Sequence, residues 1–101
     1  MAMSLAAAPN DPAQQQLHTA LGKAFEAQGN LAEAAVHYEA ALNLEPWSTD
    51  KLCDLATIFF KMTRFDEAAT LYRAALYVDP RHWPARINLA HTLRSAWRGT
   101  I

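Results

Sequence analysis

The feature of this sequence that most constrains its fold is a repeat at a fixed spacing of 34 residues. Ala-Ala-Leu at residues 40–42 recurs at residues 74–76, and Pro46 recurs as Pro80. A period of this length indicates stacked supersecondary units, each too small to bury its own apolar face. Because stacked units present a long surface and seldom carry chemistry themselves, the repeat favours a protein-binding function.

Composition and length agree with one small domain. The chain has 101 residues, of which 51% are hydrophobic, and this is enough for a single core. The single cysteine excludes an internal disulfide. No apolar run approaches the ~20 residues of a membrane span, and no basic segment precedes the short apolar stretch near the start. We therefore expect a cytoplasmic protein without membrane contact, with residues 1–11 as a flexible tail.

Proline, glycine and capping residues divide the rest of the chain into five predicted helices. Pro12 suits the first helical turn, Gly29 suits a helix exit, and Ser48 can cap the third helix. Apolar residues recur at helical spacing between these points. The predicted helices cover roughly residues 12–28, 31–44, 48–62, 65–78 and 83–97. Because the turns are short, consecutive helices must be antiparallel, and the predicted fold is all-α.

The repeated residues resemble the tetratricopeptide repeat family, whose pattern is W-x2-L-G-x2-Y, then A-x3-F, then a proline. The first unit reads His18-x2-Leu21-Gly22-x2-Phe25, then Ala34-x3-Tyr38 and Pro46. The second reads Leu52-x2-Leu55-Ala56-x2-Phe59, then Ala68-x3-Tyr72 and Pro80, and a third begins Arg86-x2-Leu89-Ala90-x2-Leu93. His18 and Arg86 depart from the bulky apolar residue of the pattern, and Thr63 replaces its usual turn glycine.

The resemblance implies an antiparallel helix-pair solenoid that coils into a superhelix. Residues 12–101 would form one domain, with repeat one at 15–48, repeat two at 49–82, and a partial repeat or capping helix at 83–98. In this family a peptide or helix of a partner lies in the concave groove, which is lined by the first helix of each pair. The residues expected to face it are Thr19, Lys23, Glu26, Cys53, Thr57, Phe60, Lys61, Ile87, His91 and Arg94.

Two kinds of side chain in this expected groove suggest how it would bind. Phe60 would be an exposed aromatic anchor, of the type that often dominates binding energy. Lys61, His91 and Arg94 would offer donors for a carboxylate. Each of these residues also fits an ordinary exposed position on a helix.

One subgroup of the family can be compared directly. Chaperone cofactors of this type hold terminal carboxylates with Lys, Asn, Asn, Lys and Arg. The matching positions here are Thr19, Lys23, Asp54, Pro84 and Asn88. None of them carries the expected side chain, and Asp54 would repel a carboxylate, so we do not expect that specificity.

Other functions find little support in the residues. The four histidines are scattered, so we expect no metal site and no cofactor. Cys53 and His91 could form a nucleophile and a base, but Cys53 also reads as a small residue on a helix surface, and we expect no enzyme. Trp47 and Trp83 could stack on nucleic-acid bases, but packing at the turns explains them better, and we expect no nucleic-acid partner.

The last predicted helix carries an apolar stripe of Leu89, Leu93 and Trp97, spaced four residues apart. We expect Ile87 and Ala90 to pack back onto the second repeat, which leaves the stripe open at the end of the array. Arrays normally end in a polar face. The alternative function is therefore self-association or tethering, with the chain as a homo-oligomer or as the N-terminal part of a larger multidomain protein.

Charge is unevenly distributed along the chain. Residues 1–50 hold six acidic side chains and one basic one, whereas residues 81–101 hold four arginines and no acid. This uneven distribution has two interpretations. The charged side chains belong to ordinary solvated helix faces, or they provide electrostatic complementarity, either head to tail between copies or with an acidic partner.

Overall fold

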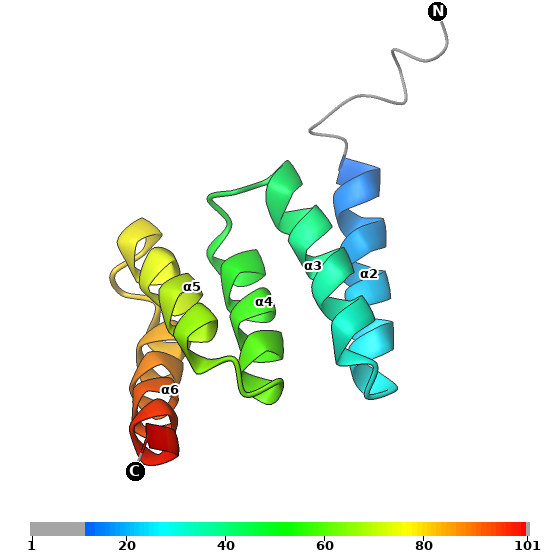
Figure 1. Ribbon diagram of the computed structural model, residues 1–101. Helices are drawn as coiled ribbons and strands as arrows, with labels where there is room; N and C mark the ends of the chain where they lie inside the picture. Colours follow the sequence, from blue (N-terminus) through cyan, green and yellow to red (C-terminus); the bar gives the residue numbers. More distant parts are fainter. Residues whose placement is uncertain (1–11, 101) are drawn as a thin grey trace, which may run out of the picture.

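The computed structural model describes residues 12–100, with side chains through residue 98. This part of the chain contains five α-helices and no strand, so the predicted all-α fold is confirmed (Figure 1). The helices are α2 (Pro12–Ala27), α3 (Leu31–Leu44), α4 (Thr49–Lys61), α5 (Phe65–Val78) and α6 (Trp83–Thr100). The tail predicted at residues 1–11 lies outside the described residues, and the division into repeats stays a prediction.

The turns inside the two helix pairs use the same backbone hydrogen bonds 34 residues apart. The N–H of Asn30 donates to the carbonyl of Phe25 at 2.9 Å, and the N–H of Arg64 donates to that of Phe59 at 2.8 Å. This six-to-one bond needs a residue in the left-handed region just before the donor. Gly29 holds that conformation at φ 79°, and Thr63 holds it at φ 59°.

Side-chain caps fix the starts of α3 and α4. Asn30 accepts a hydrogen bond from the N–H of Glu33, and Ser48 accepts one from the N–H of Lys51. These bonds satisfy donors that a helix leaves unpaired at its start. Arg64 stands at the corresponding position before α5 without a side-chain cap. The cap predicted at Ser48 is therefore confirmed.

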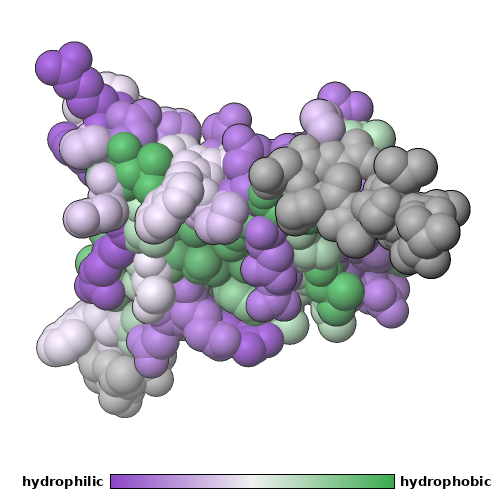
Figure 2. Space-filling model, turned by 90° about the horizontal axis from the view of Figure 1, so that it is seen from above, coloured by the Kyte–Doolittle hydropathy of each residue, from purple (hydrophilic) through white to green (hydrophobic). Residues whose placement is uncertain are grey.

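The core lies between the antiparallel helices, where small residues face aromatic rings. Ala34, Ala56, Ala68 and Ala75 are fully buried, and Tyr38 and Tyr72 are only 2% exposed. Seen from the end where the α3–α4 and α5–α6 turns lie, hydrophobic residues form a band through the middle of the molecule, with hydrophilic residues on both sides (Figure 2). The band follows from packing each helix against its neighbours in chain order (Figure 1).

Helix α6 packs against α5 with a different face from the one expected. Ala85 and Thr92 are buried at 0% and 1% exposure, whereas Ile87 is 61% exposed and Ala90 is also exposed. The prediction that Ile87 and Ala90 pack back onto the second repeat is therefore wrong. Close packing against α5 is achieved by small side chains, and the hydroxyl of Thr92 is satisfied by the carbonyl of Asn88 at 2.7 Å.

The turn tryptophans also differ from expectation. Trp47 is 72% exposed and Trp83 is 65% exposed, so packing at the turns does not account for them. Trp47 lies in the turn before α4 and Trp83 is the first residue of α6, where no neighbouring helix covers them. The guanidinium of Arg86 lies 5.3 Å from the ring centre of Trp83.

Candidate functional site

Three neighbouring hollows run along the side of the molecule formed by α2, α4 and α6. The first and second hollows share Thr19, Lys23 and Lys51, and the second and third share Thr57 and Asn88. The shared residues make the three hollows one continuous groove, which we call the α2–α4–α6 groove. Its lining comes mainly from the first helix of each pair, as the resemblance implied.

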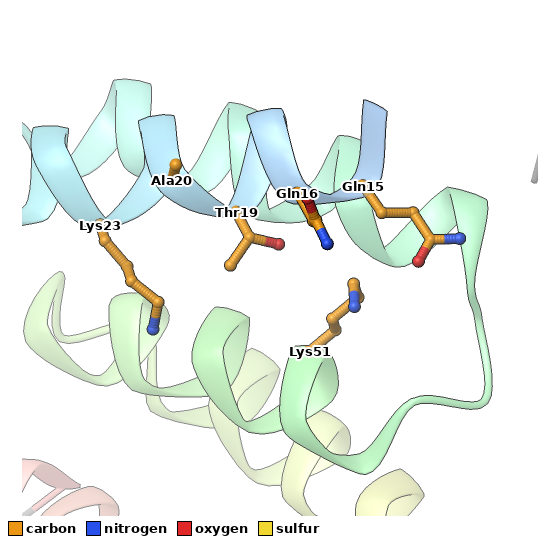
Figure 3. A pocket seen from close by; sticks show the side chains of 6 residues that line it. All are labelled: Gln15, Gln16, Thr19, Ala20, Lys23 and Lys51. Carbon is orange, nitrogen blue, oxygen red and sulfur yellow. The ribbon is translucent and has the colours of Figure 1, made fainter. Parts of the chain in front are cut away.

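The first hollow, of about 440 Å³, lies between α2 and the start of α4 (Figure 3). Figure 3 shows Thr19 and Lys23 pointing from α2 toward α4, and Lys51 pointing back from α4. The ammonium of Lys51 is paired with Glu45 at 3.1 Å. Most residues that line this end of the groove are polar, and Lys23 is an exposed cation among them.

The second hollow, of about 510 Å³, brings together all five positions compared with the chaperone cofactors. Among them, Asp54 is half-buried on α4. Burial raises the pKa of Asp54, and the charge of Lys23 only partly offsets this effect. A carboxylate among the residues that line the hollow disfavours an anionic ligand there.

Cys53 lines the same hollow and is half-buried. Burial raises the pKa of Cys53 to about 11, and the charges of Asp54 and Asp50 add to the effect. A thiol with a raised pKa is a poor nucleophile near neutral pH. His91 lines the third hollow and not this one, so the hollows do not bring the two residues together.

The third hollow, of about 270 Å³, includes Phe60 and His91. The Phe60 ring is less exposed than expected from the sequence, because it is partly buried and packs against two other rings. It lies 5.3 Å from Phe65, edge to face, and 5.2 Å from His91, approximately stacked. The hydroxyl of Thr57 lies 2.7 Å from that of Tyr72, which fixes the wall beside these rings.

Glu26 holds three helices together at the edge of the groove. It accepts a hydrogen bond from Tyr38 of α3 at 2.9 Å and another from Lys61 of α4 at 2.6 Å. Lys61 is therefore already paired within the chain, and its role as a donor to a ligand carboxylate stays a prediction. No local sequence pattern indicates this pairing, because the two residues lie 35 positions apart.

The remaining expected groove residues, Ile87 and Arg94, line none of these three hollows. They lie on the side of α6 turned away from α5, where Leu93 is 42% exposed and Trp97 is 68% exposed. Leu89 is separated from this surface because it packs against the core beside α5. We call the exposed surface the α6 open face; it consists of Trp83, Arg86, Ile87, Ala90, Leu93, Arg94, Trp97 and Arg98.

A further hollow, of about 400 Å³, lies on another side of the molecule, between α3 and α5. Leu42, Leu55, Phe59 and Leu71 are its apolar residues, and Glu39, Asp66 and Glu67 are its charged ones. We call it the α3–α5 hollow. This hollow was not predicted from the sequence, because its residues come from three helices and no single helix contains the pattern.

Two features of the described residues bear on other functions. Across residues 12–98, no three side chains of His, Cys, Asp or Glu converge in a way that could hold a metal ion. In the part of the chain that the structure describes, no helix combines the length and apolarity that a transmembrane helix requires. The expected cytoplasmic location stays a prediction.

The chain is similar to a known protein and to a protein family. A protein O-mannosyl-transferase of Caenorhabditis elegans is 28% identical over 87 residues, which cover 86% of this chain and 13% of that protein. The chain thus spans about an eighth of the length of this relative. The tetratricopeptide repeat family profile matches residues 25–80, more than half of the chain. With its repeated motif and the five antiparallel helices of its described residues, the chain belongs to the tetratricopeptide repeat family.

Proposed function

We propose that this chain is a non-catalytic protein-interaction module that binds a peptide or a helix of a protein partner in the α2–α4–α6 groove. The observation that carries the proposal is the continuity of the groove, whose three hollows share residues from all three helices. An extended segment lying along it would contact each helix in turn.

The chemistry of the groove changes along its length, which gives a bound segment a direction. Lys23 and the paired Lys51 lie toward the α2 end, the half-buried Asp54 lies in the middle, and the Phe60 and His91 rings lie toward the other end. A segment with an apolar or aromatic residue at one end and polar residues at the other would complement this order.

Selection of ligands followed by blocking of the groove tests this function. Twelve-residue peptides would be selected on the immobilised chain from a random phage library, and their affinities measured by fluorescence anisotropy. Asn88→Arg places a large charged side chain in the two hollows that Asn88 lines, so the dissociation constant should rise by about tenfold or more.

Val36→Arg is the matched control, because Val36 is 57% exposed on α3 and lines none of the groove hollows. Its affinity for the selected peptides should equal that of the unmodified chain. If the peptides bind Asn88→Arg as tightly as the unmodified chain, the groove is not their site.

The second candidate function is self-association or tethering through the α6 open face. The observation that favours it is the exposure of three large apolar side chains, Ile87, Leu93 and Trp97, on one helix. Contiguous exposed apolar residues usually mark a contact with another molecule. The greater length of the C. elegans relative is compatible with such a module serving within a larger protein.

Light-scattering mass across a concentration series tests this candidate. The unmodified chain should show a mass above that of the monomer as concentration rises, and Leu93→Glu should return it to the monomer. The reason is that the carboxylate introduced at this position would be buried in the contact without a partner. A mass that is the same for both proteins would exclude association through Leu93.

A further inference from the structure

The α3–α5 hollow combines an apolar floor with an acidic rim. Leu55 is only 3% exposed and Phe59 is half-buried beneath the hollow, while Glu39, Asp66 and Glu67 stand exposed around it. No basic residue is among the residues that line it. Such a hollow complements an apolar side chain that is flanked by cations.

Arg64 of the same chain already contacts two residues of this hollow through its guanidinium group. Its guanidinium lies 4.6 Å from the centre of the Phe59 ring. The same group donates to both carboxylate oxygens of Glu67, each at 2.6 Å. A guanidinium held between an aromatic face and a carboxylate is a favourable arrangement.

Arg64 forms no ion pair with the other two acids of the rim. Glu39 and Asp66 form no ion pair among the described residues, and both are exposed. They stand on different helices, α3 and α5. The hollow therefore retains two separate carboxylates for the cations of a second molecule.

The complementary surface is present on the same chain, in the α6 open face. This surface carries Leu93 and Trp97 next to the exposed Arg94 and Arg98, and residues 81–101 contain no acid at all. It therefore presents apolar side chains with flanking guanidinium groups, the pattern that the α3–α5 hollow complements.

We propose that the α6 open face of one copy docks in the α3–α5 hollow of a second copy. Leu93 and Trp97 cover the apolar floor, and Arg94 and Arg98 face Glu39 and Asp66. The proposal rests on the self-association candidate and adds its partner surface. Because the two surfaces differ, the contact is heterologous, in contrast to a pairing of two α6 helices.

A charge-reversal pair tests the proposal by light-scattering mass and sedimentation. One variant carries Glu39→Lys and Asp66→Lys, and the other carries Arg94→Glu and Arg98→Glu. All four side chains are exposed, so circular dichroism should show unchanged helix content. Each variant alone should dissociate, with a dissociation constant raised by about tenfold or more.

Mixing the two variants is the decisive step. The hollow of each protein then meets an α6 face of opposite charge, and the mass of a mixed complex should return. Glu33→Lys and Arg81→Glu are controls with the same types of charge change outside both surfaces, and each should keep the mass of the unmodified chain.

Two results would overturn the proposal and differ in what else they exclude. If Leu93→Glu abolishes association but the Glu39 and Asp66 variant associates normally, copies associate through α6 without the hollow. If the unmodified chain remains monomeric at every concentration, self-association itself is excluded along with this contact. Neither result bears on peptide binding in the α2–α4–α6 groove.

Discussion

At the scale of single residues, Gly22 occupies a position where the packing of α2 against α3 leaves no room for a side chain. A Cβ atom placed on Gly22 would lie 2.8 Å from two atoms of the Tyr38 ring. That ring cannot move easily, because it is 2% exposed and its hydroxyl is bonded to Glu26. Gly22 therefore sets the distance between α2 and α3.

Gly22→Ala should lower the free energy of unfolding by about 1–2 kcal/mol, because overpacking outweighs the better helix propensity of alanine. Urea denaturation followed by circular dichroism measures the change. The matched variant is Ala56→Gly in the second pair, where alanine is already accommodated. It should also lose stability, through propensity and a small void. A Gly22→Ala chain as stable as the original would show that Tyr38 can shift.

Glu26 links stability to pH. Burial alone would raise the pKa of Glu26, but the hydrogen bonds from Lys61 and Tyr38 and the nearby lysine charges outweigh burial, so the pKa is lowered. A carboxyl group with a lowered folded-state pKa stabilises the fold above its unfolded pKa. This contribution is lost as pH falls through the folded-state value.

Glu26→Gln should therefore be less stable than the original chain at pH 7, by at most about 1 kcal/mol because Lys61 is half-exposed. As pH falls through the lowered folded-state pKa of Glu26 the two proteins should converge, since the carboxyl group is then protonated in the folded chain as well. Thermal unfolding between pH 3 and pH 7 measures both values. A stability difference that does not change with pH would show that the pairing does not lower the pKa.

At the scale of elements, the two turns within helix pairs differ in one residue that carries strain. Thr63 adopts φ 59°, a conformation that costs a β-branched residue about 1 kcal/mol or more, whereas Gly29 adopts it freely. The hydroxyl of Thr63 donates to the carbonyl of Met62 at 2.5 Å, which offsets part of this cost.

Thr63→Gly should raise the free energy of unfolding by about 0.5–1 kcal/mol. Gly29→Thr, the opposite change in the equivalent turn, should lower it by a similar or larger amount. Both are measured by urea denaturation. A loss of stability in Thr63→Gly would mean that the hydroxyl bond to Met62 contributes more than the backbone strain costs.

The elements also show which expectations a single sequence can support. The 34-residue period predicted the helices and the groove, because residues such as Ala34 and Ala68 repeat in both identity and burial. The rotation of α6 was mispredicted because apolar residues lie all around that helix. The useful signal was Thr92, which lies 34 residues after the buried Ile58 and is itself 1% exposed.

Pairings between helices were less accessible to prediction. Lys61 was expected to face a ligand, but its partner Glu26 lies on another helix, and no local pattern reports a contact across that distance. The α3–α5 hollow was missed for the same reason, since its floor and rim come from three helices. Spacing along one element predicts which residues share a face, but not what lies opposite.

At the scale of the whole molecule, each helix contacts chiefly its neighbours in the chain, so stability should be distributed unevenly (Figure 1). Helix α6 covers a cluster that includes Leu52, Ala56 and Tyr72, and it contributes the buried Ala85 to that cluster. Removing α6 should therefore weaken α4 and α5 more than α2 and α3.

A chain ending at His82 should melt at least roughly 10 °C below the full chain, as expected for the loss of about 2 kcal/mol in a domain of this size. Hydrogen exchange should show a larger loss of protection in α4 and α5 than in α2 and α3. Equal losses in all four helices would show that the molecule unfolds as one cooperative unit.

The exposure of the tryptophans determines what the intrinsic fluorescence of this chain can report. All three, Trp47, Trp83 and Trp97, are 65–72% exposed, whereas the buried Tyr38 and Tyr72 carry the aromatic core. Tryptophan emission should therefore change little when the chain unfolds, because the indole rings are already surrounded by water. The same emission should shift to shorter wavelength when a partner covers α6, so an optical signal that is poor for folding is well placed to report assembly.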